Sequence, residues 1–133
     1  MHPIKLEFLD HVAIRVKDMQ ASQMWYQKTL GMKKLTFQEW GEYPVFMVTG
    51  NFGVALFPAN ISDPPMPKSK NVKIDHFAFR VSPDNFKVAQ RFFNEQKVSF
   101  FYQDHVYFES IYLYDPDGHI VELTTPTERL ENQ

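Results

Sequence analysis

The chain contains an internal repeat. Leu9-Asp10-His11-Val12-Ala13-Ile14-Arg15-Val16 returns as Ile74-Asp75-His76-Phe77-Ala78-Phe79-Arg80-Val81, which places the two histidines 65 positions apart. A repeated segment indicates that one structural unit is built twice. In both copies large apolar residues alternate with small or polar ones, a period of two that is typical of a half-buried β-strand. Each histidine is therefore expected to point away from the apolar face of its strand.

Both halves of the chain show the same order of predicted elements, β-α-β-β-β. The first half predicts strands over 9–16, 33–40, 43–49 and 52–57, with a helix over 19–30 that Asp18 caps and Gly31 ends. The second half predicts strands over 73–81, 98–102, 107–114 and 119–124, with a helix that begins at Pro83. We expect an α+β fold.

The segment between the halves, residues 58–71, has four prolines and few apolar residues, so it predicts a linker. We expect a single domain over 1–133, with module one at about 6–58 and module two at about 72–125. Two such modules can join their sheets into a curved half-barrel with the helices outside and a cup inside.

Composition excludes several classes of function. The 14 Lys and Arg nearly balance the 16 Asp and Glu, and no basic tract occurs, so nucleic acid is not an expected partner. No apolar segment approaches the length of a membrane span, and the N-terminal residues lack the apolar stretch of a signal sequence, so we expect a cytoplasmic protein. The chain has no cysteine, so a bound metal must use imidazole and carboxylate ligands.

A predicted hairpin brings a carboxylate into the pattern. Asp115-Pro116-Asp117-Gly118 is a strong turn signal, and Glu122 follows it in the last strand. A three-residue loop with Gly118 in the left-handed conformation places Tyr112 directly across from Glu122. A four-residue loop would instead place Ile111 there and turn Tyr112 away.

His11, His76 and Glu122 form the candidate metal site. Two imidazoles and one carboxylate leave open coordination positions on Fe(II), and Zn(II), Mn(II), Ni(II) or Co(II) can also occupy such a site. A lone histidine in a strand is more often structural. Its duplication, together with a carboxylate in the last strand, favours a site for one divalent ion per chain.

The paired Asp-His-x-Ala strands and the closing Asp-Pro-Asp-Gly-His-Ile-Val-Glu-Leu resemble the vicinal oxygen chelate superfamily over Leu6 to Thr125. This superfamily includes glyoxalase I, extradiol dioxygenases, fosfomycin-resistance transferases, methylmalonyl-CoA epimerase and bleomycin-binding proteins. The resemblance implies paired βαβββ modules, a divalent metal in the cup, and a small substrate that chelates the metal through adjacent oxygens. It also implies a homodimer.

Glyoxalase I and the epimerase use a second carboxylate from the last strand of module one. The 65-residue offset places Phe57 at that position, and Phe57 cannot bind a metal. We therefore expect a three-ligand site, with Phe57 as a substrate contact.

Extradiol dioxygenases have a similar order of His105, Ile111-Tyr112, the Asp-Pro-x-Gly turn and Glu122. This similarity implies that Tyr112 and His105 act as catalytic residues on substrate oxygens. The alternative is that Tyr112 only lines a pocket and His105 is a solvated loop residue. The last strand of module one lacks the base histidine of those enzymes.

Arg15 and Arg80 share the faces of the two histidines. They can bind a substrate carboxylate through the guanidinium fork, or end their strands in exposed ion pairs. Asp10 and Asp75 alternate out of phase with the histidines and are expected to be structural.

We expect a metal-dependent enzyme, with ring-cleaving dioxygenase chemistry ahead of lyase or isomerase chemistry. A fosfomycin-type thiol transferase is disfavoured because Ala13 stands where those enzymes hold a hydroxyl. A non-catalytic binder of the bleomycin-resistance type is the other alternative.

Overall fold

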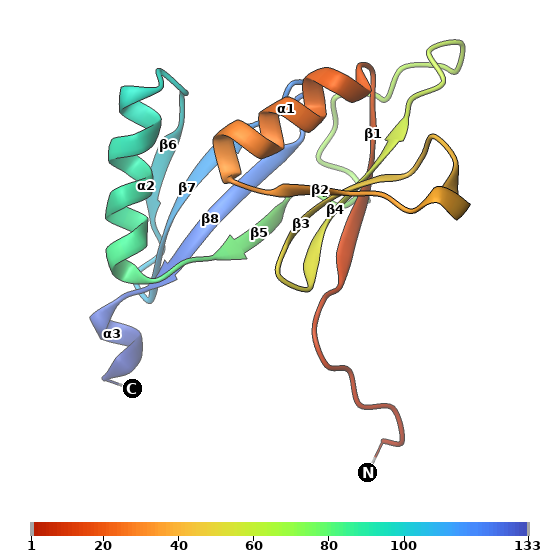
Figure 1. Cartoon of the computed structure of the whole chain (residues 1–133). Helices are drawn as coiled ribbons and strands as arrows, with labels where there is room; N and C mark the ends of the chain where they lie inside the picture. The colour runs from red at the N-terminus through yellow and green to blue at the C-terminus, as the bar shows by residue number, and fades with distance from the viewer. Residues whose placement is uncertain (1, 133) are drawn as a thin grey trace. The chain divides into compact units, whose positions relative to one another are not determined.

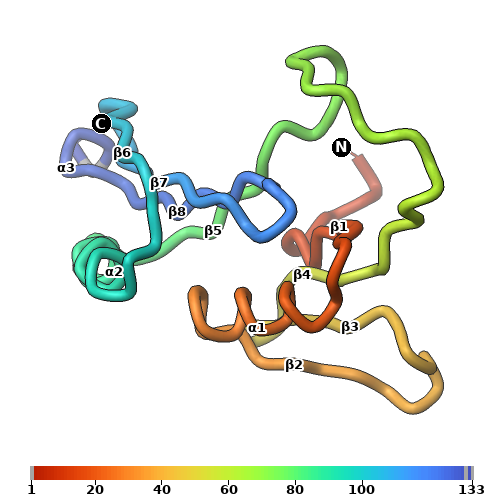
Figure 2. The backbone as a smooth tube through the Cα atoms, turned by 90° about the horizontal axis from the view of Figure 1, so that it is seen from above, coloured from red at the N-terminus to blue at the C-terminus, as the bar shows by residue number. Residues whose placement is uncertain are grey.

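A computed structural model describes residues 2–132 of the chain (Figure 1). They divide into two compact units, called here the first and the second unit. The boundary along the sequence lies between Pro65 and Met66. Residues 59–76, which contain this boundary, form neither helix nor strand and run as an irregular connection (Figure 2). Within the described part of the chain, every helix is too short or too polar to cross a membrane.

The first unit is a four-stranded sheet with one long helix. Its elements are β1 (His11–Val16), α1 (Met19–Leu30), β2 (Lys33–Leu35), the 3-10 helix η1 (Gln38–Trp40), β3 (Val45–Thr49) and β4 (Phe52–Pro58). The strand order is β1-β4-β3-β2, with β1 parallel to β4 and the other pairs antiparallel. Helix α1 contacts β2, β3 and β4.

The second unit repeats this arrangement. Its elements are β5 (Phe77–Arg80), α2 (Pro83–Glu95), β6 (Phe101–Asp104), β7 (Phe108–Tyr114), β8 (Ile120–Pro126) and the short α3 (Glu128–Glu131). The strand order is β5-β8-β7-β6, with β5 parallel to β8. Helix α2 contacts β8.

Both long helices begin at the residues that capping chemistry favours. The Asp18 carboxylate accepts a hydrogen bond from the Ala21 amide, and α1 ends at Gly31, whose φ is 69°. The Ser82 hydroxyl accepts from the Asn85 amide, and Pro83 occupies the first turn of α2.

Each sheet keeps its apolar core on one face, because successive side chains of a strand point to opposite sides. In the second unit Ile111 pairs with Leu123 and Leu113 pairs with Val121, and all four side chains are buried. The first unit buries a similar set, comprising Val16, Tyr26, Val45, Met47, Val54 and Leu56. The opposite face of each sheet is left for polar side chains and aromatic rings.

The structure confirms the predicted α+β fold and the βαβββ order of both units. The prediction for α1 is confirmed to the residue. The strand predicted over 33–40 is wrong beyond Leu35, because Gln38–Trp40 turns into a 3-10 helix. The strand predicted over 73–81 is also too long, since β5 begins only at Phe77. The joining of the two sheets into one cup stays a prediction.

Candidate functional site

The hairpin between β7 and β8 has the three-residue loop that places Tyr112 opposite Glu122. Asp115 donates its amide to the carbonyl of His119, and Gly118 is left-handed with a φ of 85°. The register pairs Tyr112 with Glu122 directly. The prediction that rested on this loop length is confirmed, and the four-residue alternative is wrong.

Glu122 and His76 come together in the second unit. The His76 Nε2 lies 2.9 Å from Oε1 of Glu122, and Nδ1 lies 2.8 Å from Oδ2 of Asp75. The hydrogen bond to His76 is the main cause that lowers the pKa of Asp75, so Asp75 is ionised at neutral pH. His76 is thus held between two carboxylates.

This arrangement fits a metal cation. A neutral imidazole has one N–H, so it can donate to only one of the two carboxylates. Once Asp75 accepts from Nδ1, the lone pair of a neutral ring at Nε2 faces the Glu122 oxygen, and either a proton on Nε2 or a metal ion in its place can join the two atoms. A carboxylate that orients a histidine in this way is the usual support of a metal ligand. The 2.9 Å separation also allows both atoms to bind one ion at about 2.1 Å each.

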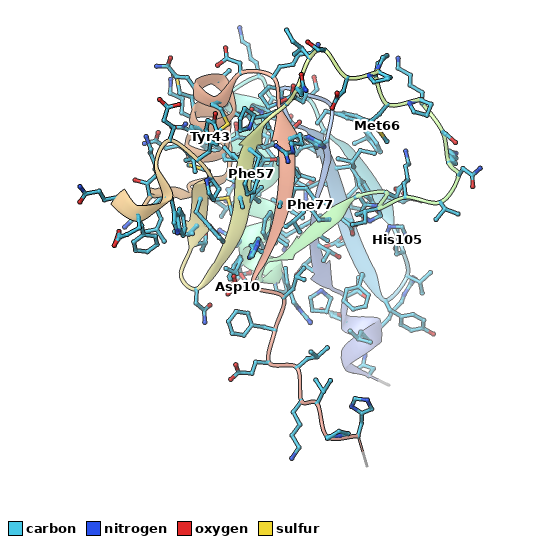
Figure 3. All side chains as sticks on the ribbon, turned by 90° about the vertical axis from the view of Figure 1, so that its right-hand side faces the viewer. Asp10, Tyr43, Phe57, Met66, Phe77 and His105 are labelled. Atoms are coloured by element: carbon cyan, nitrogen blue, oxygen red, sulfur yellow. The ribbon has the colours of Figure 1, made fainter. Side chains whose placement is uncertain are left out.

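The first unit repeats only the histidine half of this arrangement. The His11 Nδ1 lies 2.8 Å from Oδ2 of Asp10, which Figure 3 labels just before β1. Both aspartates therefore orient a histidine, a role the sequence reading missed when it treated them as structural. Among residues 2–132 no group of three or more metal-ligating side chains comes together, and His11 belongs to the other unit. The three-ligand site of His11, His76 and Glu122 stays a prediction.

The strand register corrects the position assigned to Phe57. Glu122 pairs with Ala78 and Tyr112, whereas Ala55 pairs with Ala13 and Phe46. Ala13 is the repeat partner of Ala78, so Ala55 is the equivalent of Glu122. The offset is 67 rather than 65 in the last strand, in part because the hairpin loop of the second unit is one residue longer.

Alanine, like phenylalanine, binds no metal. The expectation that the first unit supplies no second carboxylate at this position therefore holds, although the residue differs. By the same register Phe46 is the equivalent of Tyr112. The Phe46 ring lies edge-on to His11 at 5.1 Å, as the Tyr112 ring lies edge-on to His76 at 5.8 Å.

Tyr112 and His105 form a hydrogen-bonded pair. The Tyr112 hydroxyl lies 2.9 Å from Nε2 of His105, which follows β6 (Figure 3). Burial raises the pKa of Tyr112, and the nearby charge of Glu122 raises it further. Tyr112 therefore keeps its proton at neutral pH and can act as a hydrogen-bond donor.

A strained turn carries His105. The Tyr107 amide donates to the His105 carbonyl across Val106, whose φ is 70°, so the three residues form a γ-turn that is rare for a β-branched residue. The Val106 amide donates to Asp104 at 2.8 Å, and the Thr127 hydroxyl donates to the Val106 carbonyl at 2.7 Å. Strain of this kind is often found at functional sites. The sequence carried no signal of it.

Arg15 and Arg80 both lie over phenylalanine rings. The Arg15 guanidinium is 5.2 Å from the ring centre of Phe57 and donates to the Pro58 carbonyl at 3.1 Å. The Arg80 guanidinium is 5.8 Å from the ring centre of Phe108. Substrate binding by Arg15, Arg80 and Phe57 stays a prediction.

A comparison with protein families decides the wider identity of the chain. The family model described as the Glyoxalase/Bleomycin resistance protein/Dioxygenase superfamily matches residues 8–123. The chain belongs to this superfamily. The match spans both units, including His11, His76 and Glu122, so the family predicted from the repeated histidine strands is confirmed.

Known members of the superfamily include enzymes. The chain is 26% identical over 118 residues to the glutathione transferase FosA of Serratia marcescens. The match covers 89% of this chain and 80% of the relative. A glyoxalase/dioxygenase from Nostoc punctiforme is 26% identical, with a TM-score of 0.77 and 96% of each chain covered. A lactoylglutathione lyase from Agrobacterium tumefaciens shares the fold at 19% identity, with a TM-score of 0.71 over 97% of this chain and 98% of its own.

Ser110 is the site residue that the sequence reading missed. Its hydroxyl donates to Oε2 of Glu122 at 2.7 Å, and its side chain is fully buried. The signal was present in the sequence, because Ser110 lies two positions before Tyr112 and therefore on the same face of β7. Two polar residues two positions apart on the strand that pairs with Glu122 were the signal that could have found Ser110.

Proposed function

We propose that the chain is a divalent-metal-dependent enzyme, with His11, His76 and Glu122 as the metal ligands. The observation that carries this proposal is the position of His76, whose ring is oriented by Asp75 at 2.8 Å and directs Nε2 to Glu122 at 2.9 Å, an arrangement that fits a shared metal ion. A bound divalent ion would supply Lewis-acid activation of a substrate that chelates it through adjacent oxygens. His11 is assigned as the third ligand because it is the repeat equivalent of His76 and is oriented by Asp10 in the same way.

Tyr112 and His105 supply the acid–base chemistry in this proposal. Tyr112, whose ring lies edge-on to His76 at 5.8 Å, presents its hydroxyl beside His76 and donates a hydrogen bond to a substrate oxygen. As negative charge develops on that oxygen, the Tyr112 proton moves to it, and His105, whose Nε2 lies 2.9 Å from the hydroxyl, hydrogen-bonds the phenolate that remains. The strained γ-turn at Val106 keeps His105 in reach of the hydroxyl.

Within the superfamily we place ring-cleaving dioxygenase chemistry first. The support is the His105–Tyr112 pair beside Glu122, which matches the order of residues that resembles the extradiol enzymes. A thiol transferase is the second candidate, supported by the 26% identity to a glutathione transferase. Ala13, at the position of a hydroxyl in the fosfomycin enzymes, speaks against the second candidate. We also propose a homodimer, for which light scattering should give about twice the 15.7 kDa of one chain.

Metal analysis tests the proposal. The full chain, incubated with Fe(II), Zn(II), Mn(II) or Ni(II) and then desalted, should retain about one ion, and Glu122→Ala should retain none. A chain that stays metal-free with all four ions would refute the metalloenzyme.

Two activity assays then separate the reaction classes. Oxygen consumption with a catechol supports the dioxygenase, and glutathione consumption with an epoxide supports the transferase. Whichever activity is found, Tyr112→Phe should keep the metal and lower turnover by about 10²-fold, the lower range for a positioned acid. Unchanged turnover would make Tyr112 a pocket wall only. A chain that holds its metal and catalyses neither reaction would favour a lyase or a binder.

A further inference from the structure

We propose that Ser110 is a positioning residue that makes Glu122 bind the metal ion through one oxygen, and thereby sets which ions the site prefers. This inference rests on the proposed function, because it concerns the same metal site. It starts from the buried side of Glu122, where Ser110 Oγ lies 2.7 Å from Oε2 and 2.9 Å from Oγ1 of Thr124. Ser110 is fully buried and Glu122 is 8% exposed.

The direction of these hydrogen bonds follows from the number of protons. A hydroxyl has one proton, and an ionised carboxylate can only accept. Ser110 therefore donates to Glu122 and accepts from Thr124. The other acceptor near the Thr124 hydroxyl, the carbonyl of Glu109, lies at 3.5 Å, the outer limit of a hydrogen bond. The result is a short buried hydrogen-bond network that runs from Thr124 through Ser110 to Glu122.

This hydrogen-bond network gives the two oxygens of Glu122 different partners. Oε2 is engaged by Ser110, and Oε1 is the oxygen at 2.9 Å from His76 Nε2. A rotation of the carboxylate that offers both oxygens to an ion would break or weaken the 2.7 Å hydrogen bond from the buried Ser110 hydroxyl, which is costly. Carboxylates that are free to do so bind hard ions through both oxygens and raise the coordination number. Ser110 keeps the contribution of Glu122 to one ligand.

The strand provides a matched control one residue away. Thr125 is fully buried, and its hydroxyl has no hydrogen-bond partner among the described residues. Thr125 points to the opposite face of β8 from Thr124. Valine at position 124 removes one hydroxyl of the hydrogen-bond network, whereas valine at position 125 removes a hydroxyl that lies outside this network.

Co(II) is the probe, because its visible absorption reports the coordination number as well as binding. The full chain should lose about 10- to 100-fold in Co(II) affinity on Ser110→Ala, the usual effect of removing the support of a metal ligand. The visible absorption of Co(II) bound to this variant should weaken, because the coordination number of the ion rises. Thr124→Val should lose about threefold through the weakened Ser110 hydrogen bond. Thr124→Ser, which keeps the hydroxyl, and Thr125→Val should both stay within about twofold of the parent.

Each outcome decides the inference. A Ser110→Ala chain that binds Co(II) with the parent affinity and spectrum would overturn it and leave Ser110 a structural residue. If Ser110→Ala does not fold by circular dichroism, Thr124→Val decides, and an unchanged affinity there overturns the inference. A parent chain that binds none of the ions tested, Co(II) included, overturns the proposed function itself. A parent that binds Co(II) beside unaffected variants overturns only the role of Ser110.

Discussion

Replacing Thr125 with valine is expected to stabilise the protein, whereas the same change at Thr124 is expected to destabilise it. The Thr125 hydroxyl is fully buried and has no hydrogen-bond partner in the described residues, a situation that costs about 1–3 kcal/mol. Valine has the same shape and adds a buried methyl group in place of the hydroxyl. We expect Thr125→Val to raise the free energy of unfolding by about 1–2 kcal/mol.

Thr124 gives the opposite sign because its hydroxyl is used. It lies 2.9 Å from Ser110 Oγ, and a hydrogen bond of this kind is worth about 1 kcal/mol net. Thr124→Val should therefore lower the free energy of unfolding by about that amount. The two variants should differ by about 2–3 kcal/mol, although they change the same atoms on adjacent residues.

Urea unfolding of the metal-free chain measures this difference. The midpoint of Thr125→Val should rise and that of Thr124→Val should fall, with an unchanged slope in both. Removing metal first with a chelator separates stability from ion binding. A Thr125→Val chain that is no more stable than the parent would show that the hydroxyl is satisfied in solution, and the reasoning would be refuted.

Two further predictions concern the metal site. In chelator-treated protein, the pKa of Tyr112, followed by its ¹³Cζ NMR signal, should lie above the ordinary tyrosine value near 10, and Glu122→Gln should lower it part of the way back; a pKa at or below 10 would contradict the effect of partial burial and of the Glu122 charge on Tyr112. Because folding then favours the protonated phenol, the Tyr112 contribution to stability is constant below pH 10 and falls as pH rises above it. Ala55→Glu, which supplies the first unit with the carboxylate it lacks, should increase the stabilisation by Co(II) in a thermal melt, whereas Phe57→Glu should not; the reverse order would show that the register equivalence is wrong.

The fold could be predicted from sequence because its signals are local. Alternation of period two marks the strands, Asp18 and Gly31 mark the ends of α1, and the turn residues before Glu122 fix a hairpin. Strand ends were less accurate. β5 begins at Phe77 although the apolar pattern starts earlier, because strand length depends on where a neighbouring strand offers hydrogen bonds.

The sequence predicted which residues of the second unit lie together, but not the side chains that support them. His76, Glu122 and Tyr112 follow from the repeat and from the loop length, both visible in the sequence. The roles of Asp75 and Ser110 depend on side-chain directions across a sheet, and the γ-turn at Val106 depends on contacts with Thr127 from another strand end. A fixed 65-residue offset failed at Phe57 because loop lengths differ between the units, and an error of two residues keeps the face but changes the partner.

The two units share one part of the candidate site and differ in the rest. Both keep the pair in which aspartate orients histidine, with the same 2.8 Å contact. Only the second unit has the carboxylate and the phenol, since Ala55 and Phe46 occupy the equivalent positions in the first. A separate metal site in each unit would need a ligating side chain where the first unit has alanine. The repeat therefore does not give the two units the same ligand set, and the one ion per chain in the proposed function is consistent with Ala55.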